Sequence, residues 1–360
     1  MTAHVMIVGV GDMGLRFAHG LAASGEVARL TLVGLNQGRG PELAAMLEDC
    51  YDIGVRFVPL DATDTVRVET LLREARPDLL VQSAALQGPW AMVGRGDAFA
   101  RTMSAAGLGV QLPAQLPVLM SVMTAVRNVD FRGPVANLSF PDVTHAVLDK
   151  LGLAPTIGLG NASMIQRRIL SSLRRRAERE GRNAPPPLVR VIAHHHQVYG
   201  VMTATRPADA ADLVLAFAGE EAAPVGDHAY DGFGLSPDIR YNQLTAIAAL
   251  PTLLALLPGA APARVSTPAP FGLPGGWPVR IEAGRITLDL PPGIAQDEVL
   301  ARHARQMRGD GVESIGADGL VTFTPSVVAA LRRISPALAE PVHPRDALMR
   351  FDALRRAVMA

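Results

Sequence analysis

The sequence predicts an α/β protein whose first half forms a doubly wound parallel sheet and whose second half forms an α+β domain. Three observations support this prediction. Short apolar runs alternate with amphipathic stretches, a glycine-rich turn follows the first apolar run, and the alternation stops near residue 152. Such alternation is typical of parallel βαβ units. We therefore expect two domains, one at residues 1–152 and one at 153–360 that binds substrate and forms the oligomer.

The elements of the first half follow from this alternation. Each expected strand is a short apolar run, and each expected helix has apolar residues at helical spacing. The expected strands are 5–10, 30–33, 55–58, 79–82, 133–138 and 156–158, with helices at 15–24, 41–49, 65–74 and 118–128. The segment 84–117 contains several glycines and prolines, which predicts a long functional loop or lid.

The second half has a different pattern. A proline-rich break precedes a strand at 188–193, and a hairpin is expected around Gly284. Helices are expected at 161–181, 207–218, 237–257, 296–308, 325–334 and 344–359. The first of these is rich in arginine, but Glu178 and Glu180 interrupt the basic run, which indicates a solvated helix face rather than a nucleic-acid site.

Composition excludes several classes of protein. The chain has 360 residues, 49% of them hydrophobic, and 34 basic residues against 34 acidic ones, so neither disorder nor nucleic-acid or membrane binding is expected. Cys50 is the single cysteine, which excludes an internal disulfide and a thiolate metal cluster. The apolar stretch 244–261 is interrupted by Pro251 and Pro258, as in a buried, kinked helix. With no leader evident at the N-terminus, we expect a cytoplasmic protein with a small-molecule substrate.

The first expected strand ends in a turn of the form G-x-G-x-x-G. The glycines are Gly9, Gly11 and Gly14, with Asp12 and Met13 between the last two. The first glycine permits a tight turn, the second lets the backbone approach a pyrophosphate, and the third allows close helix–strand packing. The following helix then directs its N-terminus at the phosphates. The turn predicts a Rossmann-type domain that binds a dinucleotide.

The end of the second expected strand bears on cofactor choice. An acid there binds the ribose 2′-hydroxyl of NAD, but Gly34 occupies that position. Without this carboxylate, Arg39 can face a 2′-phosphate, with Asn36 in the intervening turn. We therefore expect NADP(H) to be favoured over NAD(H). Ser83 and Ala84, which follow the fourth strand, are also expected to contact the cofactor.

From residue 135 onward the chain resembles the lactate/malate dehydrogenase superfamily, and the order of elements matches over most of the length. The segment 135–137 resembles the family strand that ends in an asparagine, and 157–167 resembles the family helix start I-G-x-G-x-x-x-D-x-x-R. The resemblance implies that Asn137 binds substrate and orients the nicotinamide, and that Arg167 binds the substrate carboxylate. Met164 stands where the family has its catalytic aspartate.

Two later segments extend the resemblance. The segment 192–197 resembles the family's G-E-H-G-D, which places His195 on the catalytic histidine. The segment 241–246 resembles the start of the helix that borders the substrate pocket. The glycine- and proline-rich segment stands where the family has its mobile loop, so Arg95 and Arg101 are both candidates for the loop arginine. The family also implies a homodimer or homotetramer.

The chemistry of His195 leaves its partner open. Imidazole titrates near neutral pH and suits proton transfer, and a carboxylate on its second nitrogen would fix the tautomer. Met164 cannot supply that carboxylate. Asp142 replaces it, or the histidine works unsupported, or the chemistry differs. On a strand, His194 and His196 would share the face opposite His195; with no carboxylate or thiolate nearby in sequence, we expect no metal there.

These observations predict an NAD(P)-dependent oxidoreductase, with NADP favoured. Its substrate would be a small carboxylated keto or hydroxy compound, or an imine or amine. A second hypothesis stays open because of Met164: a protein of the same fold that binds a nucleotide without catalysis, or that catalyses a redox-neutral reaction.

Overall fold

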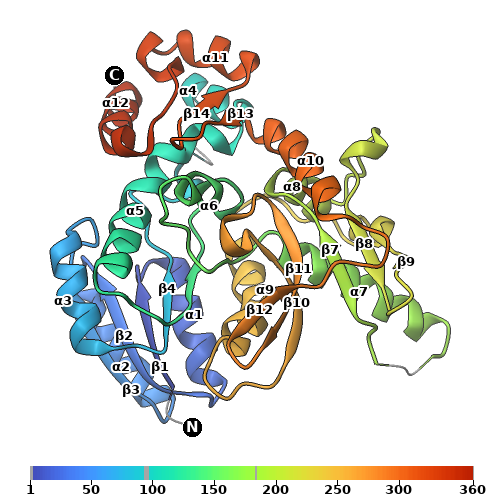
Figure 1. The fold of residues 1–360 in the computed structure, drawn as a ribbon, viewed down its shortest axis with the longest axis horizontal. Coiled ribbons are helices and arrows are strands. Elements are labelled where there is room, and N and C mark those ends of the chain that lie inside the picture. Colours follow the sequence, from blue (N-terminus) through green and yellow to red (C-terminus); the bar gives the residue numbers. More distant parts are fainter. Residues whose placement is uncertain (1–2, 93–96, 183–184, 360) are drawn as a thin grey trace.

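A computed structural model describes residues 3–92, 97–182 and 185–359, and its first half contains one parallel sheet (Figure 1). The strands are β1 (Ala3–Val8), β2 (Val27–Gly34), β3 (Gly54–Pro59), β4 (Leu79–Gln82), β5 (Val135–Asn137) and β6 (Ile157–Gly158). Their order is β3-β2-β1-β4-β5-β6, and every neighbouring pair is parallel. This is the doubly wound Rossmann order, so the predicted fold class is confirmed.

Helices cover both faces of this sheet because successive residues of each strand point to opposite sides. Val5 and Ile7 of β1 belong to one apolar core, while Met6 and Val8 belong to the other. The helices of this half are α1 (Asp12–Ala23), α2 (Arg39–Cys50), α3 (Thr65–Ala75), α4 (Ala98–Ala105), α5 (Leu112–Asn128) and α6 (Pro141–Asp149). The first core includes α1, and the second includes α3, α5 and α6.

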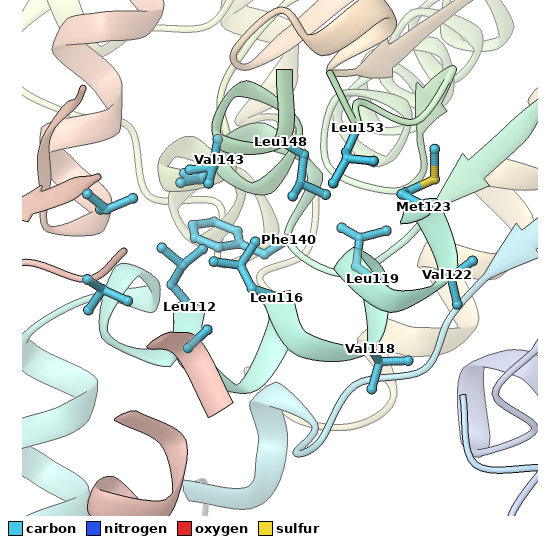
Figure 2. Close-up of a cluster of buried hydrophobic side chains, with 14 of the residues drawn as sticks. Leu112, Leu116, Val118, Leu119, Val122, Met123, Phe140, Val143, Leu148 and Leu153 are labelled. Carbon is cyan, nitrogen blue, oxygen red and sulfur yellow. The ribbon is translucent and has the colours of Figure 1, made fainter. Parts of the chain in front are cut away.

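The expectation of a long irregular loop at 84–117 is wrong. The segment contains η1 (Pro89–Met92), α4 and η2 (Leu108–Gln111), and α5 begins at Leu112 rather than at residue 118. The physical reason is burial: Leu112, Leu116 and Leu119 recur at helical spacing and fill the second core (Figure 2). Their packing outweighs Pro117 inside the helix.

Helix α5 also meets the length and hydropathy of a membrane span. Residues 108–128 have a mean hydropathy of 1.3 over an 18-residue window, of which 78% is buried inside the protein. The helix packs against α3, against α6 and against α12 (Ala347–Met359). We interpret α5 as a core helix for this reason.

The described residues of the second half form three small antiparallel sheets. One contains β7 (Val189–Ile192), β8 (Leu215–Ala218) and β9 (Ala223–Pro224), a second contains β10 (Ala263–Pro268), β11 (Gly276–Glu282) and β12 (Arg285–Leu288), and the third pairs β13 (Val312–Ile315) with β14 (Val321–Phe323). The prediction of a helix at 207–218 is wrong, because β8 pairs with β7 and only a short 3-10 turn precedes it. This pairing is with a remote segment, so local propensity does not reveal it. The elements are α7 (Ala162–Arg179), β7 (Val189–Ile192), α8 (His195–Met202), η3 (Ala210–Asp212), β8 (Leu215–Ala218), β9 (Ala223–Pro224), η4 (Gly226–Ala229), α9 (Tyr241–Ala255), β10 (Ala263–Pro268), η5 (Pro270–Gly272), β11 (Gly276–Glu282), β12 (Arg285–Leu288) and α10 (Gln296–Met307).

The C-terminal segment returns to the first half of the chain and packs beside α4 and α5 (Figure 1). Val312, Phe323 and Leu354 belong to the same core as Leu116. Its elements are η6 (Arg308–Asp310), β13 (Val312–Ile315), β14 (Val321–Phe323), α11 (Pro325–Arg332), η7 (Pro336–Ala339), η8 (Pro344–Asp346) and α12 (Ala347–Met359). The division at residue 152 stays a prediction, because β6 and this segment join the first half from beyond it.

Candidate active site

The glycine turn has the geometry that a pyrophosphate needs. Gly9 has φ +93°, and a Cβ there would lie 2.5 Å from the Ala84 nitrogen. A Cβ on Gly14 would lie 1.8 Å from the Gly9 oxygen, whereas one on Gly11 would meet nothing within 4 Å. The outer glycines are therefore required for packing, and Gly11 leaves open space beside the N-terminus of α1. Ser83 supports the turn, since its Oγ donates to the Gly9 oxygen at 2.7 Å.

Asp12 begins α1, where a free carboxylate would repel a phosphate. Its two oxygens accept hydrogen bonds from Arg16 Nε and Nη2, each at 3.0 Å, and these bonds lower the Asp12 pKa. Asn242 Nδ2 of α9 donates to the same carboxylate at 2.7 Å, and Trp90 Nε1 donates to Asn242 Oδ1 at 2.9 Å. The charge is neutralised and tied to α9, while Met13 packs partly buried against the first core. The turn therefore fits a dinucleotide.

The end of β2 presents no carboxylate. A Cβ on Gly34 would lie 2.7 Å from Val10 Cγ2, so packing as well as cofactor choice bears on this glycine. Asn36 Oδ1 accepts hydrogen bonds from the Gly38 nitrogen at 3.1 Å and the Arg39 nitrogen at 2.9 Å. This turn leads into α2 and leaves the Arg39 side chain exposed at its start.

Asn137 closes β5 and is fully buried. Its Nδ2 lies 3.0 Å from His145 Nε2, and its Oδ1 accepts a hydrogen bond from the Ser139 nitrogen at 3.0 Å. His145 Nδ1 lies 2.8 Å from the Ala269 oxygen, so Nδ1 carries the proton and Nε2 accepts from Asn137. Burial lowers the His145 pKa to about 4, which keeps it neutral. Asn137 therefore fixes the β5–α6 turn, and its contact with a substrate stays a prediction.

His195 does not lie on a strand, so the predicted alternation of its neighbours is wrong. β7 ends at Ile192, His194 is the N-cap of α8, and His195 is its first residue. The N-cap position explains the early helix start: the His194 nitrogen donates to Gln197 Oε1 at 2.9 Å, and the His196 nitrogen lies 3.4 Å from His194 Nδ1. His194 and His195 consequently face one shared neighbour instead of opposite sides.

That neighbour is Asp310 of η6. His195 Nδ1 lies 2.8 Å from Asp310 Oδ1, and the His195 nitrogen donates to Asp142 Oδ1 at 2.8 Å. The Phe140 ring stands edge-on to the imidazole, with centroids 5.3 Å apart. Asp142, the carboxylate considered from the sequence, therefore holds the main chain, and Asp310 holds the ring. Sequence reasoning missed Asp310 because it follows His195 by 115 positions and no motif marks it.

The pair has the electrostatics of an acid–base group. Burial opposes protonation of His195, but the Asp310 carboxylate outweighs burial and raises the His195 pKa. Burial alone would raise the Asp310 pKa, yet the neighbouring imidazoles hold it well below its usual value. Because Nδ1 faces Asp310, Nε2 remains for a substrate. The His195 side chain is 29% exposed, whereas that of Asp310 is 5% exposed, so only the histidine can meet solvent.

The segment before α5 fixes the Asp310 main chain. A Cβ on Gly107 would lie 2.7 Å from the Asp310 oxygen, and one on Gly109 would lie 2.6 Å from it. Gly311 has φ +87°, and a Cβ there would lie 2.5 Å from the Ala106 oxygen. Only glycines allow these backbones to approach so closely. The C-terminal segment therefore meets the predicted loop region directly at the candidate site.

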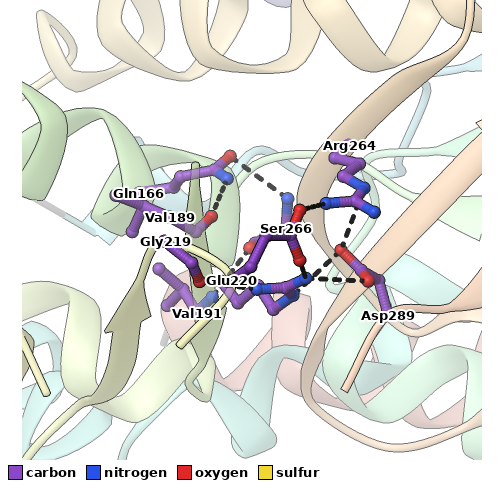
Figure 3. A network of polar contacts seen from close by, with 9 residues as sticks. Gln166, Val189, Val191, Gly219, Glu220, Arg264, Ser266 and Asp289 are labelled. Carbon is purple, nitrogen blue, oxygen red and sulfur yellow. Dashed lines mark hydrogen bonds and ion pairs between the residues drawn. The ribbon is translucent and has the colours of Figure 1, made fainter. Parts of the chain in front are cut away.

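A second network secures the strand that leads to His195 (Figure 3). Arg190 of β7 is buried; its Nε donates to Asp289 Oδ2 at 3.1 Å and its Nη2 donates to Glu220 Oε2 at 3.0 Å. The Val191 nitrogen donates to Ser266 Oγ of β10 at 2.9 Å. These bonds tie β7 to its neighbouring sheet and so fix the start of α8.

The remaining predicted residues differ in burial. Met164 is buried in an apolar cluster, with its sulfur 3.2 Å from Thr245 Oγ1, so the family's aspartate position is apolar here. Arg167 is exposed on α7 and Arg101 is exposed on α4, while Arg95 lies outside the described residues. Within the described ranges, no group of three or more His, Cys, Asp or Glu residues is placed to hold a metal ion.

No protein-family model matches the sequence, and no curated protein matches it. The structure is similar to the apo malate dehydrogenase of Picrophilus torridus, at 13% identity and TM-score 0.55, covering 86% of this chain and 97% of that one. A deep-sea metagenome lactate dehydrogenase, MGS-M5, has 13% identity and TM-score 0.51 over 85% and 99% of the chains. Plasmodium falciparum malate dehydrogenase in complex with NADH has 11% identity and TM-score 0.51 over 94% and 100%. The chain therefore has the fold of lactate and malate dehydrogenases.

Proposed function

We propose that this protein is a nicotinamide-dinucleotide-dependent oxidoreductase acting on a small carboxylated keto or hydroxy compound, or an imine or amine. The observation that carries the proposal is the His195–Asp310 pair, 2.8 Å apart. Asp142 and Phe140, just beyond the carboxyl end of β5, hold this histidine in place. The glycine turn follows the carboxyl end of β1 in the same sheet, and ligands of open α/β sheets bind at this edge.

The residues divide the work of carbonyl reduction as follows. When bound, the nicotinamide supplies the hydride that reduces the carbonyl carbon. His195 Nε2 donates the proton that the carbonyl oxygen takes up, and it accepts that proton in the reverse direction. Asp310 holds the Nδ1 proton, fixes the tautomer and stabilises the imidazolium. Asp310 thus does for His195 what Met164 cannot.

Arg167 is the proposed anchor for the substrate carboxylate, because the guanidinium fork binds a carboxylate in a bidentate manner. It is exposed on α7 and available to a ligand. Arg101 and Arg95 are the proposed loop arginines. The proposed role of Asn137 is to fix the β5–α6 turn, which precedes Phe140 and Asp142.

NADP(H) is the proposed cofactor. Gly34 leaves the end of β2 without a carboxylate that would repel a 2′-phosphate, and Arg39 is exposed at the start of α2. The proposed assembly is a homodimer or homotetramer, as the resemblance implies. The proposed compartment is the cytoplasm, where the exposed free thiol of Cys50 would stay reduced.

The test is a survey of hydride transfer, followed by nicotinamide absorbance, over small keto acids, hydroxy acids and cyclic imines with NADPH and NADH. The proposal expects turnover with one of these classes and its abolition in His195→Asn. Nucleotide binding by calorimetry without turnover of any class would instead support a non-catalytic binding protein. Turnover that survives in His195→Asn would overturn the proposed mechanism.

A further inference from the structure

We propose that His194 is a positioning residue that shares the Asp310 carboxylate with His195 and thereby limits the basicity of His195. The consequence for catalysis rests on the proposed function, whereas the sharing itself does not. His194 stands where the resembled G-E-H-G-D segment has its glutamate, so the resemblance does not predict a second imidazole here.

The carboxylate lies between two imidazoles. Asp310 Oδ1 lies 2.8 Å from His195 Nδ1, and Asp310 Oδ2 lies 3.2 Å from His194 Nδ1. The His194 side chain is 0% exposed, so water does not compete for its ring. Each carboxylate oxygen therefore has its own imidazole nitrogen.

The buried groups favour one tautomer of His194. Neither His194 Nε2 nor Asp310 Oδ2 has a hydrogen-bond partner among the described residues, so a proton on Nε2 would leave a buried donor unpaired. A proton on Nδ1 instead directs a donor at Oδ2 across the 3.2 Å contact and leaves Nε2 as a buried acceptor, which proteins tolerate better than a buried unpaired N–H. The competing cap contact, from the His196 nitrogen to His194 Nδ1, is longer at 3.4 Å, and the exposed His196 can use water. We therefore assign the His194 ring as an Nδ1–H donor directed at Asp310.

His194 has a third imidazole as its neighbour. His303 of α10 lies behind it, with ring centroids 6.0 Å apart, and its Nε2 lies 3.2 Å from the Gly276 oxygen. Burial, and then the neighbouring His194, hold the His303 pKa well below its usual value. The other charged groups that face this cluster are Asp142, close to His195, and Arg302, close to His303. Of His195 and His303, His195 is therefore the imidazole that takes up a proton first as the pH falls.

The shared carboxylate predicts in which direction the His195 pKa changes when His194 is replaced. The His194 imidazole, whose Nδ1 lies 3.2 Å from Oδ2, stabilises the Asp310 charge and draws electron density from the oxygen that faces His195. Loss of that contact would leave a more basic carboxylate and a stronger bond to the His195 imidazolium. The His195 pKa should then rise, and the alkaline limit of carbonyl reduction should move to higher pH.

Two variants distinguish the role of His194 as a donor to Asp310 from its role as the N-cap of α8. His194→Ser keeps an N-cap hydroxyl but is too short to reach Asp310, whereas His194→Asn keeps both a cap oxygen and an amide donor. The His195 ring is titrated by NMR with labelled histidine, and His195→Asn assigns its signals among the nine histidines. We expect His194→Ser to raise the His195 pKa by about one, and His194→Asn to remain near the wild-type value.

His196→Asn is the matched control, because this exposed neighbour has no hydrogen bond or ion pair with Asp310 among the described residues, and it should leave the His195 titration unchanged. An unchanged His195 pKa in His194→Ser, or equal shifts in the Ser and Asn variants, would refute the sharing. Because the titration needs no substrate, it also separates the two proposals. A shift without any hydride transfer would refute the proposed function and leave the sharing intact.

Discussion

The glycine turn, residues 9–14, and the histidine corner, formed by His195, Asp142 and Asp310, differ in how far apart their residues lie along the chain. The turn occupies residues 9–14; Gly14 packs on the Gly9 oxygen within the motif, while Gly9 also approaches Ala84 and Asp12 is bonded to Asn242. The corner joins His195 to Asp142 across 53 positions and to Asp310 across 115 positions. A motif of consecutive residues can be recognised in the sequence. A site assembled from three segments exists only when the whole chain is folded.

The two sites also differ in how they treat a carboxylate. Asp12 pairs with Arg16 one helical turn away, and the two side chains are 37% and 28% exposed, so water screens the pair. The Asp310 side chain is 5% exposed and meets two imidazoles instead of an arginine. Asp12 therefore stays charged with little effect on its surroundings, while Asp310 controls the protonation of His195.

The largest expected effect tests whether the corner is the chemical centre. His195→Asn should reduce kcat by about a thousandfold, the scale of losing a general acid or base, while the dissociation constant for NADPH stays within a factor of about two, since the turn is intact. Steady-state kinetics and calorimetry measure the two quantities. His196→Asn serves as the control, and equal losses in both variants would mean that the wrong histidine has been assigned.

The next largest effect is expected at Asp310, the carboxylate that the sequence did not reveal. Asp310→Asn keeps the side-chain volume but removes the charge, so kcat should fall by about a hundredfold. The His195 pKa should also fall, because burial then acts without the opposing carboxylate. In carbonyl reduction, which needs protonated His195, the activity should consequently be lost at lower pH than in the wild type.

A pH–rate profile measures that shift. Asp297→Asn, at the exposed start of α10, is the matched control and should leave the profile unchanged. Full activity in Asp310→Asn would mean that His195 works unsupported.

A smaller effect is expected at the predicted carboxylate anchor. Arg167→Leu should raise KM about thirtyfold, since a charge-assisted hydrogen bond contributes about 2 kcal/mol. Folding and NADPH binding should be preserved because the arginine is exposed. Arg174→Leu, an exposed arginine two turns along α7, is the control for loss of charge. An unchanged KM for the substrate in Arg167→Leu would place the carboxylate anchor elsewhere, with Arg101 the next residue to substitute.

The smallest effect is expected on the preference between NADPH and NADH, at Gly34. Gly34→Asp should weaken NADPH binding about tenfold relative to NADH, because the new carboxylate repels a 2′-phosphate. Gly34→Ala reports the steric part alone, since its Cβ meets Val10 in the same way. Fluorescence titration of both cofactors compares the two variants. Equal NADPH-to-NADH ratios in both would show that Gly34 is a packing residue only.

The sequence predicts the strands of the large sheet well and some of the helices poorly, and each outcome has a physical reason. It placed all six strands of the large sheet close to their observed positions, because buried strands are continuous apolar runs. It missed α4 and the start of α5, where Pro113 and Pro117 suggested a loop although Leu112 and Leu116 are buried. It also placed His195 on a strand, since the short run after β7 does not show that His194 caps a helix.

The sequence by itself determined the α/β class, the glycine turn and the histidine that we propose for proton transfer. Each of these depends on residues that are neighbours along the chain. Only the tertiary structure decided that Asp310, rather than Asp142 or Met164, faces the His195 ring, and that His194 shares it. The physical reason is that a carboxylate and an imidazole attract wherever the fold brings them together, and the packing of the C-terminal segment against α5 is what brings them together here.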